Sequence, residues 1–412
     1  MRSELSHRGP SPLHFRDFRL MWGGFFVSQV GTQMQVVAVA WQVYQLTGDP
    51  LALGAIGLAR VLPVVVLGVF GGVFADVVDR RRLLLGTQTA MMLCSLGLWW
   101  LTDSGRVSVP LLYAFCVLAG SATALSNPAR QAMIPTLVPE ATLPRALGLS
   151  VSSWQLATVL GPTLGGLVLA AHGPAAVYLL DAASFVAMIV ALLLIRKRGR
   201  AAPSTTVGLD ALAEGFRFLW KTPILLGLML ADFLGTFFAG AMLLMPIFAS
   251  ELLHVGPQGL GLLFAAPAVG SALVALGIAV LGAPPLAGAT VLVCIGVYGL
   301  STAAFGATGS FPLALLFLAI GGAADGASTV VRQTLRQLLT PDHLRGRMTG
   351  VTMIFFMGGP QLGELEAGAL ARFAGVRTSV IVGGLLCTAS AAVLALVLPG
   401  LRRYRLHRGQ PS

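Results

Sequence analysis

The sequence has very few charged residues for its length. Of its 412 residues only 10% are Asp, Glu, Lys or Arg, whereas 56% are hydrophobic. Soluble domains carry about 25% charged residues, and so few charges cannot cover a globule of this size. The hydrophobic residues also come in long blocks, and a bilayer core needs roughly 20 apolar residues per helix. The composition therefore excludes an ordinary soluble protein and indicates a chain that crosses a membrane many times.

Groups that would bind a metal, a cofactor or a nucleotide are also scarce. The four cysteines are isolated from one another in apolar blocks, so neither a disulfide framework nor a zinc site is predicted. The six histidines all fall in predicted loops or at helix ends, and no phosphate-binding loop ending in Lys-Ser or Lys-Thr is present. We therefore expect no metal, no cofactor and no enzymatic activity. A polytopic membrane enzyme is a distant alternative, because the clustered catalytic side chains that it needs are not seen.

The chain carries a net charge of +11, which could suggest nucleic-acid binding. Its Lys and Arg residues, however, lie in short clusters between the apolar blocks, as the positive-inside rule requires of a membrane protein. A basic groove interleaved with aromatic residues, typical of nucleic-acid binding, is absent. The polar start, residues 1–12, has no apolar region followed by a small-residue cleavage site, so no cleaved signal peptide is expected.

The apolar blocks predict twelve transmembrane helices. They span residues 19–45, 51–76, 83–102, 109–131, 143–171, 175–195, 222–250, 258–282, 286–307, 311–333, 346–371 and 377–398. An even number of helices places both termini on one side of the membrane. The Lys- and Arg-rich loops share that side, which predicts an inner-membrane protein with both termini in the cytoplasm.

The longest segment between helices divides the chain into two halves. The predicted domains are a six-helix bundle at 1–195, a cytoplasmic linker at 196–221 with an amphipathic surface helix, and a second bundle with a basic tail at 222–412. The halves also repeat: Arg130-Gln131 recurs as Arg332-Gln333 between the same pair of helices. Parallel duplicated halves are an architecture of secondary transporters.

Residues 72–82 join the second and third predicted helices and read Gly-Val-Phe-Ala-Asp-Val-Val-Asp-Arg-Arg-Arg. This segment resembles the loop motif of the major facilitator superfamily, with Val77 and Asp79 departing from the usual pattern. The resemblance implies that Asp76 meets the positive N-terminal end of a helix in the other half and holds the cytoplasmic side closed. The gating residues predicted from this loop and its partner are Gly72, Asp76, Arg80, Arg81 and Arg345.

A second segment, Leu-Gly-Pro-Thr-Leu-Gly-Gly at 160–166, lies in the fifth predicted helix. It resembles the glycine-proline motif of superfamily exporters. Proline removes a backbone hydrogen bond and bends a helix, while glycines admit a close neighbour. The motif favours export, and import of a small metabolite is the alternative. The helix-packing residues of this motif are Gly161, Pro162, Gly165 and Gly166.

Resemblance to one branch of the superfamily, that of the enterobactin (siderophore) exporters, extends over nearly the whole chain. The segments that carry it lie at 15–20, 215–219, 341–347 and 362–368. It implies an all-α membrane protein with the major facilitator fold, two six-helix bundles around a central cavity. It also implies export of a siderophore- or drug-like amphipathic compound by alternating access, energised by protons. The expected partners are this small molecule, protons and the lipid bilayer, and the protein is expected to be a monomer.

Charged residues inside the predicted helices are functional candidates, because a charge at the bilayer centre costs at least about 2.5–3.5 kcal/mol. Asp232 lies about ten residues into the seventh helix, ~15 Å deep at 1.5 Å per residue. We predict that Asp232 binds substrate or a proton and that Asp325 has a similar role. Asp325 precedes Arg332 by two helical turns, which predicts no direct contact between them, and Arg332 is expected to snorkel toward the cytoplasm.

Two further acidic residues, Glu364 and Glu366, lie in the eleventh helix. Arg60 in the second helix has a similar depth, so we predict an ion pair between Arg60 and one of these glutamates that gates the outer side. Because the two glutamates lie on different helix faces, Glu364 is favoured for the pair and the other could face the cavity.

Polar residues on one face of the first helix are expected to line the cavity, since their three- and four-residue spacing brings them together. They are Gln29, Thr32 and Gln33. Asp181, near the outer end of the sixth helix, is expected to have a structural partner.

Overall fold

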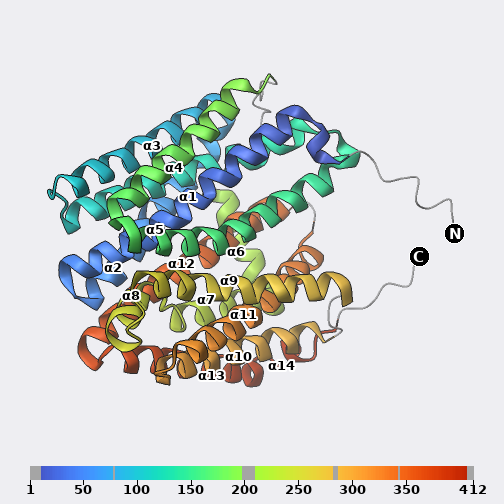
Figure 1. The fold of residues 1–412 in the computed structure, drawn as a ribbon. Helices are drawn as coiled ribbons and strands as arrows, with labels where there is room; N and C mark the ends of the chain where they lie inside the picture. The colour runs from blue at the N-terminus through green and yellow to red at the C-terminus, as the bar shows by residue number, and fades with distance from the viewer. Residues whose placement is uncertain (1–10, 78, 197–208, 282–285, 342–343, 406–412) are drawn as a thin grey trace. The chain divides into compact units, whose positions relative to one another are not determined.

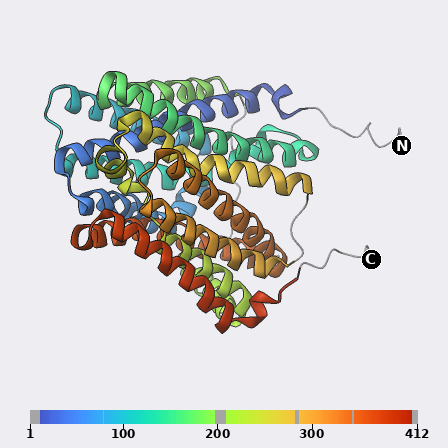
Figure 2. The same cartoon turned by 60° about the horizontal axis from the view of Figure 1, so that its bottom comes forward.

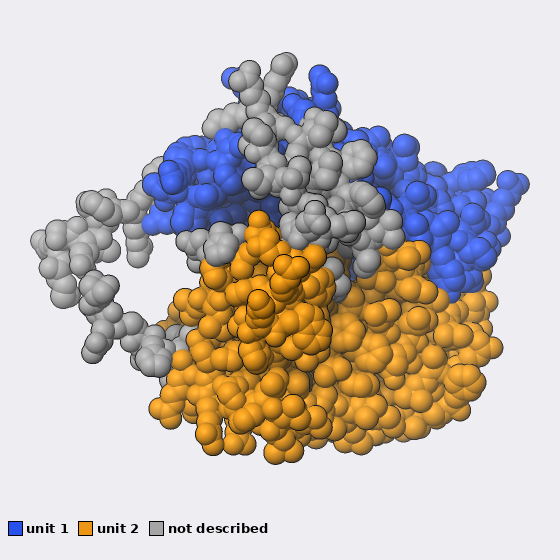
Figure 3. Space-filling model, turned by 180° about the vertical axis from the view of Figure 1, so that it is seen from behind, with its two compact units in different colours: residues 1–38, 66–206 blue, residues 39–65, 207–412 orange. Residues whose placement is uncertain are grey.

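A computed structural model of the protein describes residues 11–77, 79–196, 209–281, 286–341 and 344–405. These residues form helices joined by short connections, and no strand occurs among them (Figure 1). By their contacts the residues group into two compact units, coloured in Figure 3. The first unit comprises residues 1–38 and 66–206, and the second comprises 39–65 and 207–412. These units are defined by contacts between residues, whereas the predicted domains were defined by the linker and the internal repeat. The domain division predicted from the sequence therefore stays a prediction.

The first half of the chain forms five long helices. They are α1 (Arg16–Thr47), α2 (Pro50–Val77), α3 (Arg80–Asp103), α4 (Val109–Leu137) and α5 (Leu143–Leu194), with short 3-10 turns at Pro12–His14 and Glu140–Thr142. The long α5 is two helices, because Gly173 has the left-handed backbone angles φ 75° and ψ −179°. Pro174 then begins the second part, a position where its missing N–H costs nothing. This break lies between the predicted fifth and sixth helices.

The second half begins with an amphipathic helix and continues through longer helices and short helical segments. They are α6 (Leu209–Lys221), α7 (Pro223–Phe238), η4 (Met242–Leu244), α8 (Met245–Ile247), η5 (Phe248–Leu252), α9 (Gly256–Leu281), α10 (Ala287–Ala307), α11 (Phe311–Leu339), α12 (Arg345–Ala374), α13 (Val376–Val397) and α14 (Pro399–Arg402). In this unit α10 packs against both α11 and α13 (Figure 2). The predicted amphipathic helix of the linker is α6, which packs on α12.

Eight helical segments of the described residues are long and apolar enough to cross a membrane. One of them, Glu140–Leu194, holds two helices, and Pro50–Pro63 is a shorter apolar helix. The helices α1 and α12 are long enough but carry the polar and charged residues that were selected above as functional candidates. The positions of the predicted spans agree with these helices to within a few residues, apart from the longer C-terminal ends of α4 and α11.

The seventh span departs from the prediction of one continuous helix over 222–250. After α7 ends at Phe238 the chain turns and resumes as η4, α8 and η5. Gly240 fits closely here, since a Cβ at this position would lie 2.7 Å from the carbonyl oxygen of Thr236. Pro246 also removes a backbone donor just after the turn. The span itself is confirmed by the apolar segment Pro223–Leu252. Its break was not predicted, because apolar composition alone does not distinguish a straight helix from a broken one.

The glycine motif of α5 lies against α1 within the first unit. A Cβ on Gly161 would overlap the Cβ of Gln33 and lie 2.8 Å from the carbonyl oxygen of Val30. A Cβ on Gly165 would lie 2.9 Å from the Cα of Met34. The two glycines therefore allow the backbones of α1 and α5 to approach closely, as small residues do in membrane bundles.

Replacing Gly161 with valine should prevent this packing and strongly reduce the amount of folded protein, because backbone atoms of α1 cannot move aside. The matched control is Gly148→Val in the same helix, where a Cβ would meet nothing within 4 Å. The measurement is the monodisperse yield in detergent by fluorescence-detected size-exclusion chromatography. Equal yields of the two variants would contradict the close packing.

Candidate functional site

The centre of the candidate site is a buried ion pair between α7 and α11 in the second unit. The Arg332 guanidinium nitrogen NH2 lies 2.8 Å from Oδ1 of Asp232. Only 7% of the Arg332 side chain and 9% of the Asp232 side chain are exposed. A buried charge is tolerated only with a partner of opposite charge and further hydrogen bonds. The same guanidinium donates to the hydroxyl groups of Ser328 at 3.0 Å and Thr329 at 2.9 Å.

A second carboxylate, Asp325, contacts the same guanidinium nitrogen. Its Oδ1 lies 3.5 Å from NH2 of Arg332, and 41% of its side chain is exposed. Arg332 thus contacts one buried and one partly exposed carboxylate. One turn further along α7, the Thr236 hydroxyl donates to the backbone carbonyl of Asp232 at 2.8 Å.

Two sequence-based expectations for Arg332 were wrong. The side chain contacts Asp325 although the two residues are two turns apart, because helix side chains lean toward the N-terminus and arginine is long. Arg332 also does not snorkel away from the membrane interior; it is buried against α7. The counter-charge of Asp232 makes this burial possible, and it comes from a helix far away in the sequence.

A second feature of the second unit is the acid at the break of the seventh helix. Glu364 of α12 is buried, and its two carboxylate oxygens accept hydrogen bonds from the backbone N–H groups of Met242 at 3.1 Å and Leu243 at 2.9 Å. These donors begin a helical segment, where backbone N–H groups have no partner within the helix. The positive end of the segment also favours a negative charge at this place. Glu364 therefore caps the restart of the broken helix.

The predicted ion pair of Arg60 with Glu364 takes a looser form. The first part of α2 packs on α12, since a Cβ on Gly57 would lie 3.1 Å from the Cβ of Glu364. Arg60 interacts electrostatically with Glu364. Both carboxylate oxygens, however, accept hydrogen bonds from the backbone N–H groups of Met242 and Leu243, the first two residues of η4. Glu366 is half-buried and takes no part in this cap. The role of Arg60 as an outer gate stays a prediction.

The polar face predicted on α1 belongs to the first unit. Gln33 lies against Gly161 of α5, and the Thr32 hydroxyl donates to the carbonyl of Ser28 at 3.0 Å. Gln29 is half-buried. Gln35, two residues further on, was not predicted from the sequence. Its amide nitrogen donates to the hydroxyl of Ser95 at 3.0 Å. The proposed cavity-lining role of this face stays a prediction.

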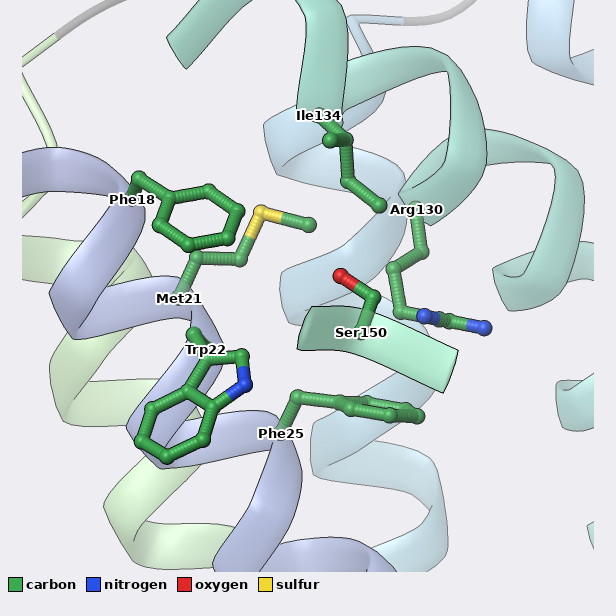
Figure 4. A pocket seen from close by; sticks show the side chains of 7 residues that line it. All are labelled: Phe18, Met21, Trp22, Phe25, Arg130, Ile134 and Ser150. Carbon is green, nitrogen blue, oxygen red and sulfur yellow. The ribbon is translucent and has the colours of Figure 1, made fainter. Parts of the chain in front are cut away.

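Arg130, which the internal repeat relates to Arg332, has a different environment. Its guanidinium carbon lies 4.0 Å from the ring centroid of Phe25, and no carboxylate of the described residues is within ion-pair distance (Figure 4). At the offset between the two arginines, Asp232 corresponds to Val30. Only the second arginine therefore has a buried acid to pair with. The small pocket around the first is lined by Phe18, Met21, Trp22, Phe25, Arg130, Ile134 and Ser150.

The predicted gating loop is described in part. Asp79, which departs from the usual motif, caps α3 by accepting from the backbone N–H groups of Arg81 and Arg82. The Arg80 side chain donates to the carbonyl of Ala132, and Arg81 donates to the carbonyls of Leu192 and Leu193 at the end of α5. The side chains of Gly72, Asp76 and Arg345 lie outside the described residues, so their gating role stays a prediction.

Comparison with known proteins connects this geometry with a family. The sequence profile of the family described as transmembrane secretion effector matches residues 8–406, nearly the whole chain. The chain belongs to the transmembrane secretion effector family. The prediction from the sequence that the protein is a major facilitator superfamily transporter is confirmed. The protein is a transporter and not an enzyme.

Two relatives match the chain along nearly their full length. The chain is 30% identical over 394 residues to the multidrug efflux pump Tap of Mycolicibacterium fortuitum, covering 91% of this chain and 94% of that protein. It is 28% identical over 391 residues to the enterobactin exporter EntS of Citrobacter koseri, covering 94% and 93%. The resemblance to the enterobactin exporter branch is thus confirmed.

Solved structures confirm the fold. A bacterial homologue of the human lysosomal transporter Spinster, inward-facing and unoccupied, matches with a TM-score of 0.76 at 15% identity, covering 97% of this chain and all of that one. A bacterial homologue of the iron transporter ferroportin, inward-facing, matches with a TM-score of 0.70 at 16% identity, covering 94% and 99%. The protein is therefore an all-α, multi-pass inner-membrane protein of the major facilitator fold.

Proposed function

We propose that the protein exports a small amphipathic compound from the cytoplasm and that protons drive the export. The observation that carries the proposal is the buried ion pair of Asp232 with Arg332, next to the partly exposed Asp325, in the helices of a secretion-family transporter. The relatives support the direction, since one is a multidrug efflux pump and another an enterobactin exporter. A drug-like or siderophore-like compound is the proposed substrate class.

The cluster offers a way to couple a proton to a conformational change. Binding of a proton to Asp232 removes the negative charge that holds Arg332. The guanidinium then interacts more favourably with the partly exposed carboxylate of Asp325. Because Arg332 and Asp232 lie on different helices, this exchange loosens α11 from α7. Release of the proton to the other side restores the pair. The two carboxylates thus provide two positions for one arginine.

Several predictions from the sequence remain part of this proposal. Both termini are proposed to lie in the cytoplasm, since the Lys- and Arg-rich loops share their side. The protein is proposed to act as a monomer by alternating access of two six-helix bundles. The cytoplasmic gate is proposed to involve Asp76, and Arg60 with Glu364 to act on the outer side.

The test of the direction uses everted membrane vesicles and ethidium as an amphipathic probe. An exporter should accumulate ethidium in vesicles whose interior is acidified, and a protonophore that collapses the gradient should abolish the accumulation. Uptake into right-side-out vesicles without uptake into everted ones would instead establish an importer. Accumulation that survives the protonophore would reject coupling to protons.

A further inference from the structure

A carboxyl group that the proposed transport cycle does not use lies inside the first unit. Asp181 of α5 is completely buried, with 0% of its surface exposed. Its Oδ2 lies 2.6 Å from the hydroxyl oxygen of Ser95 on α3, whereas its Oδ1 has no hydrogen-bond partner. A buried ionised carboxylate normally collects several donors or a cation. The carboxyl group of Asp181 contacts a single possible donor, the Ser95 hydroxyl.

The hydroxyl of Ser95 has three polar neighbours and only one hydrogen. The amide nitrogen of Gln35 on α1 donates to Ser95 Oγ at 3.0 Å, and the carbonyl oxygen of Met91 lies 3.1 Å from it. A serine hydroxyl donates once and accepts twice. The Met91 carbonyl can only accept and the Gln35 nitrogen only donates, so the hydrogen of Ser95 is contested between Met91 and Asp181.

The protonation state of Asp181 decides whether these contacts can all be hydrogen bonds. If Asp181 is ionised, Ser95 must turn its hydrogen away from Met91, and the buried charge still has one oxygen without a donor. If Asp181 is neutral, its O–H donates to Ser95, Ser95 donates to Met91, and Gln35 donates to Ser95. Each contact is then a hydrogen bond and no charge is buried.

In the part of the chain that the structure describes, the Ser95 hydroxyl is the one hydrogen-bond partner of the Asp181 carboxyl group. On α1, Gly31 faces Asp181 so closely that a Cβ there would lie 2.8 Å from Oδ1. Tyr178, on the same helix, interacts electrostatically with both Asp181 and Cys116 of α4. Tyrosine and cysteine side chains are ordinarily neutral at physiological pH. Among the described residues no Arg, Lys or His side chain forms an ion pair with Asp181.

We propose that Asp181 is a proton-binding site of the first unit, and that its bound proton forms the hydrogen bond that joins α5 to α3 through Ser95. Gln35 attaches α1 to the same hydroxyl, so one proton organises the contact of three helices. Asp181 differs in this from Asp232, which is paired with an arginine. Removal of the proton at alkaline pH places an uncompensated charge between the helices and loosens the unit.

The direct test is infrared difference spectroscopy of the purified full-length protein in detergent at neutral pH. Protonated carboxyl groups absorb apart from carboxylates, so the spectrum of the native protein minus that of Asp181→Asn should contain one lost protonated-carboxyl band. The matched control is Asp232→Asn, which should leave that band in place. Superimposable native and Asp181→Asn spectra in this region would overturn the proposal.

A second variant leaves the acid in place. Ser95→Ala removes the acceptor of the Asp181 proton, so the same band should persist and shift to the frequency of a free carboxyl group. A band that neither shifts nor disappears in Ser95→Ala would also overturn the proposal.

Thermal unfolding tests the consequence for stability. The folded protein holds a proton that the unfolded chain releases at neutral pH, so rising pH should lower the apparent melting temperature of the native protein. In Asp181→Asn the amide can donate to Ser95 without titrating, and this pH dependence should be flatter. A dependence as steep as that of the native protein would argue against a bound proton.

Discussion

Replacing Asp232 with asparagine should abolish proton-driven ethidium accumulation in everted vesicles. Asparagine is neutral at every pH, so it can neither hold Arg332 by charge nor exchange a proton. Removing one partner of a buried ion pair costs about 3–5 kcal/mol, and the remaining contact of Arg332 with Asp325 is longer and more exposed. With about 1.4 kcal/mol per factor of ten, we expect transport to fall at least tenfold. The conservative control is Asp103→Asn, an exposed carboxylate at the end of α3.

The double variant Asp232→Asn with Arg332→Gln distinguishes coupling from a structural role. Removing both charges eliminates the unpaired arginine, so the yield of folded protein should recover in either case. Transport should remain lost if proton exchange at Asp232 drives the cycle. Recovery of gradient-dependent transport in the double variant would show that the pair only joins α7 to α11.

Glu364→Gln should produce the second large loss of transport. The glutamate accepts one backbone hydrogen bond on each oxygen, from Met242 and from Leu243. Glutamine keeps one oxygen and turns an N–H₂ group toward the other backbone donor. A buried donor left without an acceptor costs about 1–3 kcal/mol. The restart of the seventh helix should therefore lose its fixed geometry, and transport should fall about tenfold or more.

The control for this variant is Glu366→Gln, the same change two residues further along α12. Glu366 is half-buried and does not cap η4, so transport should stay close to that of the native protein. Limited proteolysis between α7 and α9 provides a readout independent of transport, and cleavage should be faster in Glu364→Gln. Equal behaviour of the two variants would contradict a specific role of the cap.

Much of the fold was accessible from the sequence because its signals are local. Apolar blocks of membrane-spanning length located the helices, and Gly173-Pro174 marked the break between the two parts of α5. The amphipathic pattern located α6. The glycine-proline motif of α5 and the charged loop before α3 indicated the superfamily, and the family match agrees.

The candidate site was only partly accessible in this way. Asp232, Asp325 and Glu364 were candidates from the sequence because a charge in an apolar helix stands out, and their role in transport stays a prediction. Their contacts were not all predicted. No direct contact of Asp325 with Arg332 was expected, and neither the pair of Asp232 with Arg332 nor the cap of Glu364 on the broken helix was predicted. The break itself leaves little trace in the sequence, since Gly240 and Pro246 are ordinary residues of membrane helices.

The sequence by itself thus determined the membrane class, the helix positions and the family, because length, hydropathy and short motifs act over neighbouring residues. Tertiary structure alone decided which charges meet. The pair of Arg332 with Asp232, the cap of Glu364 on Met242 and Leu243, and the contact of Asp181 with Ser95 all join different helices. A lipid-facing helix can rotate without changing its hydropathy, and only packing against its neighbours selects the face that each polar side chain presents.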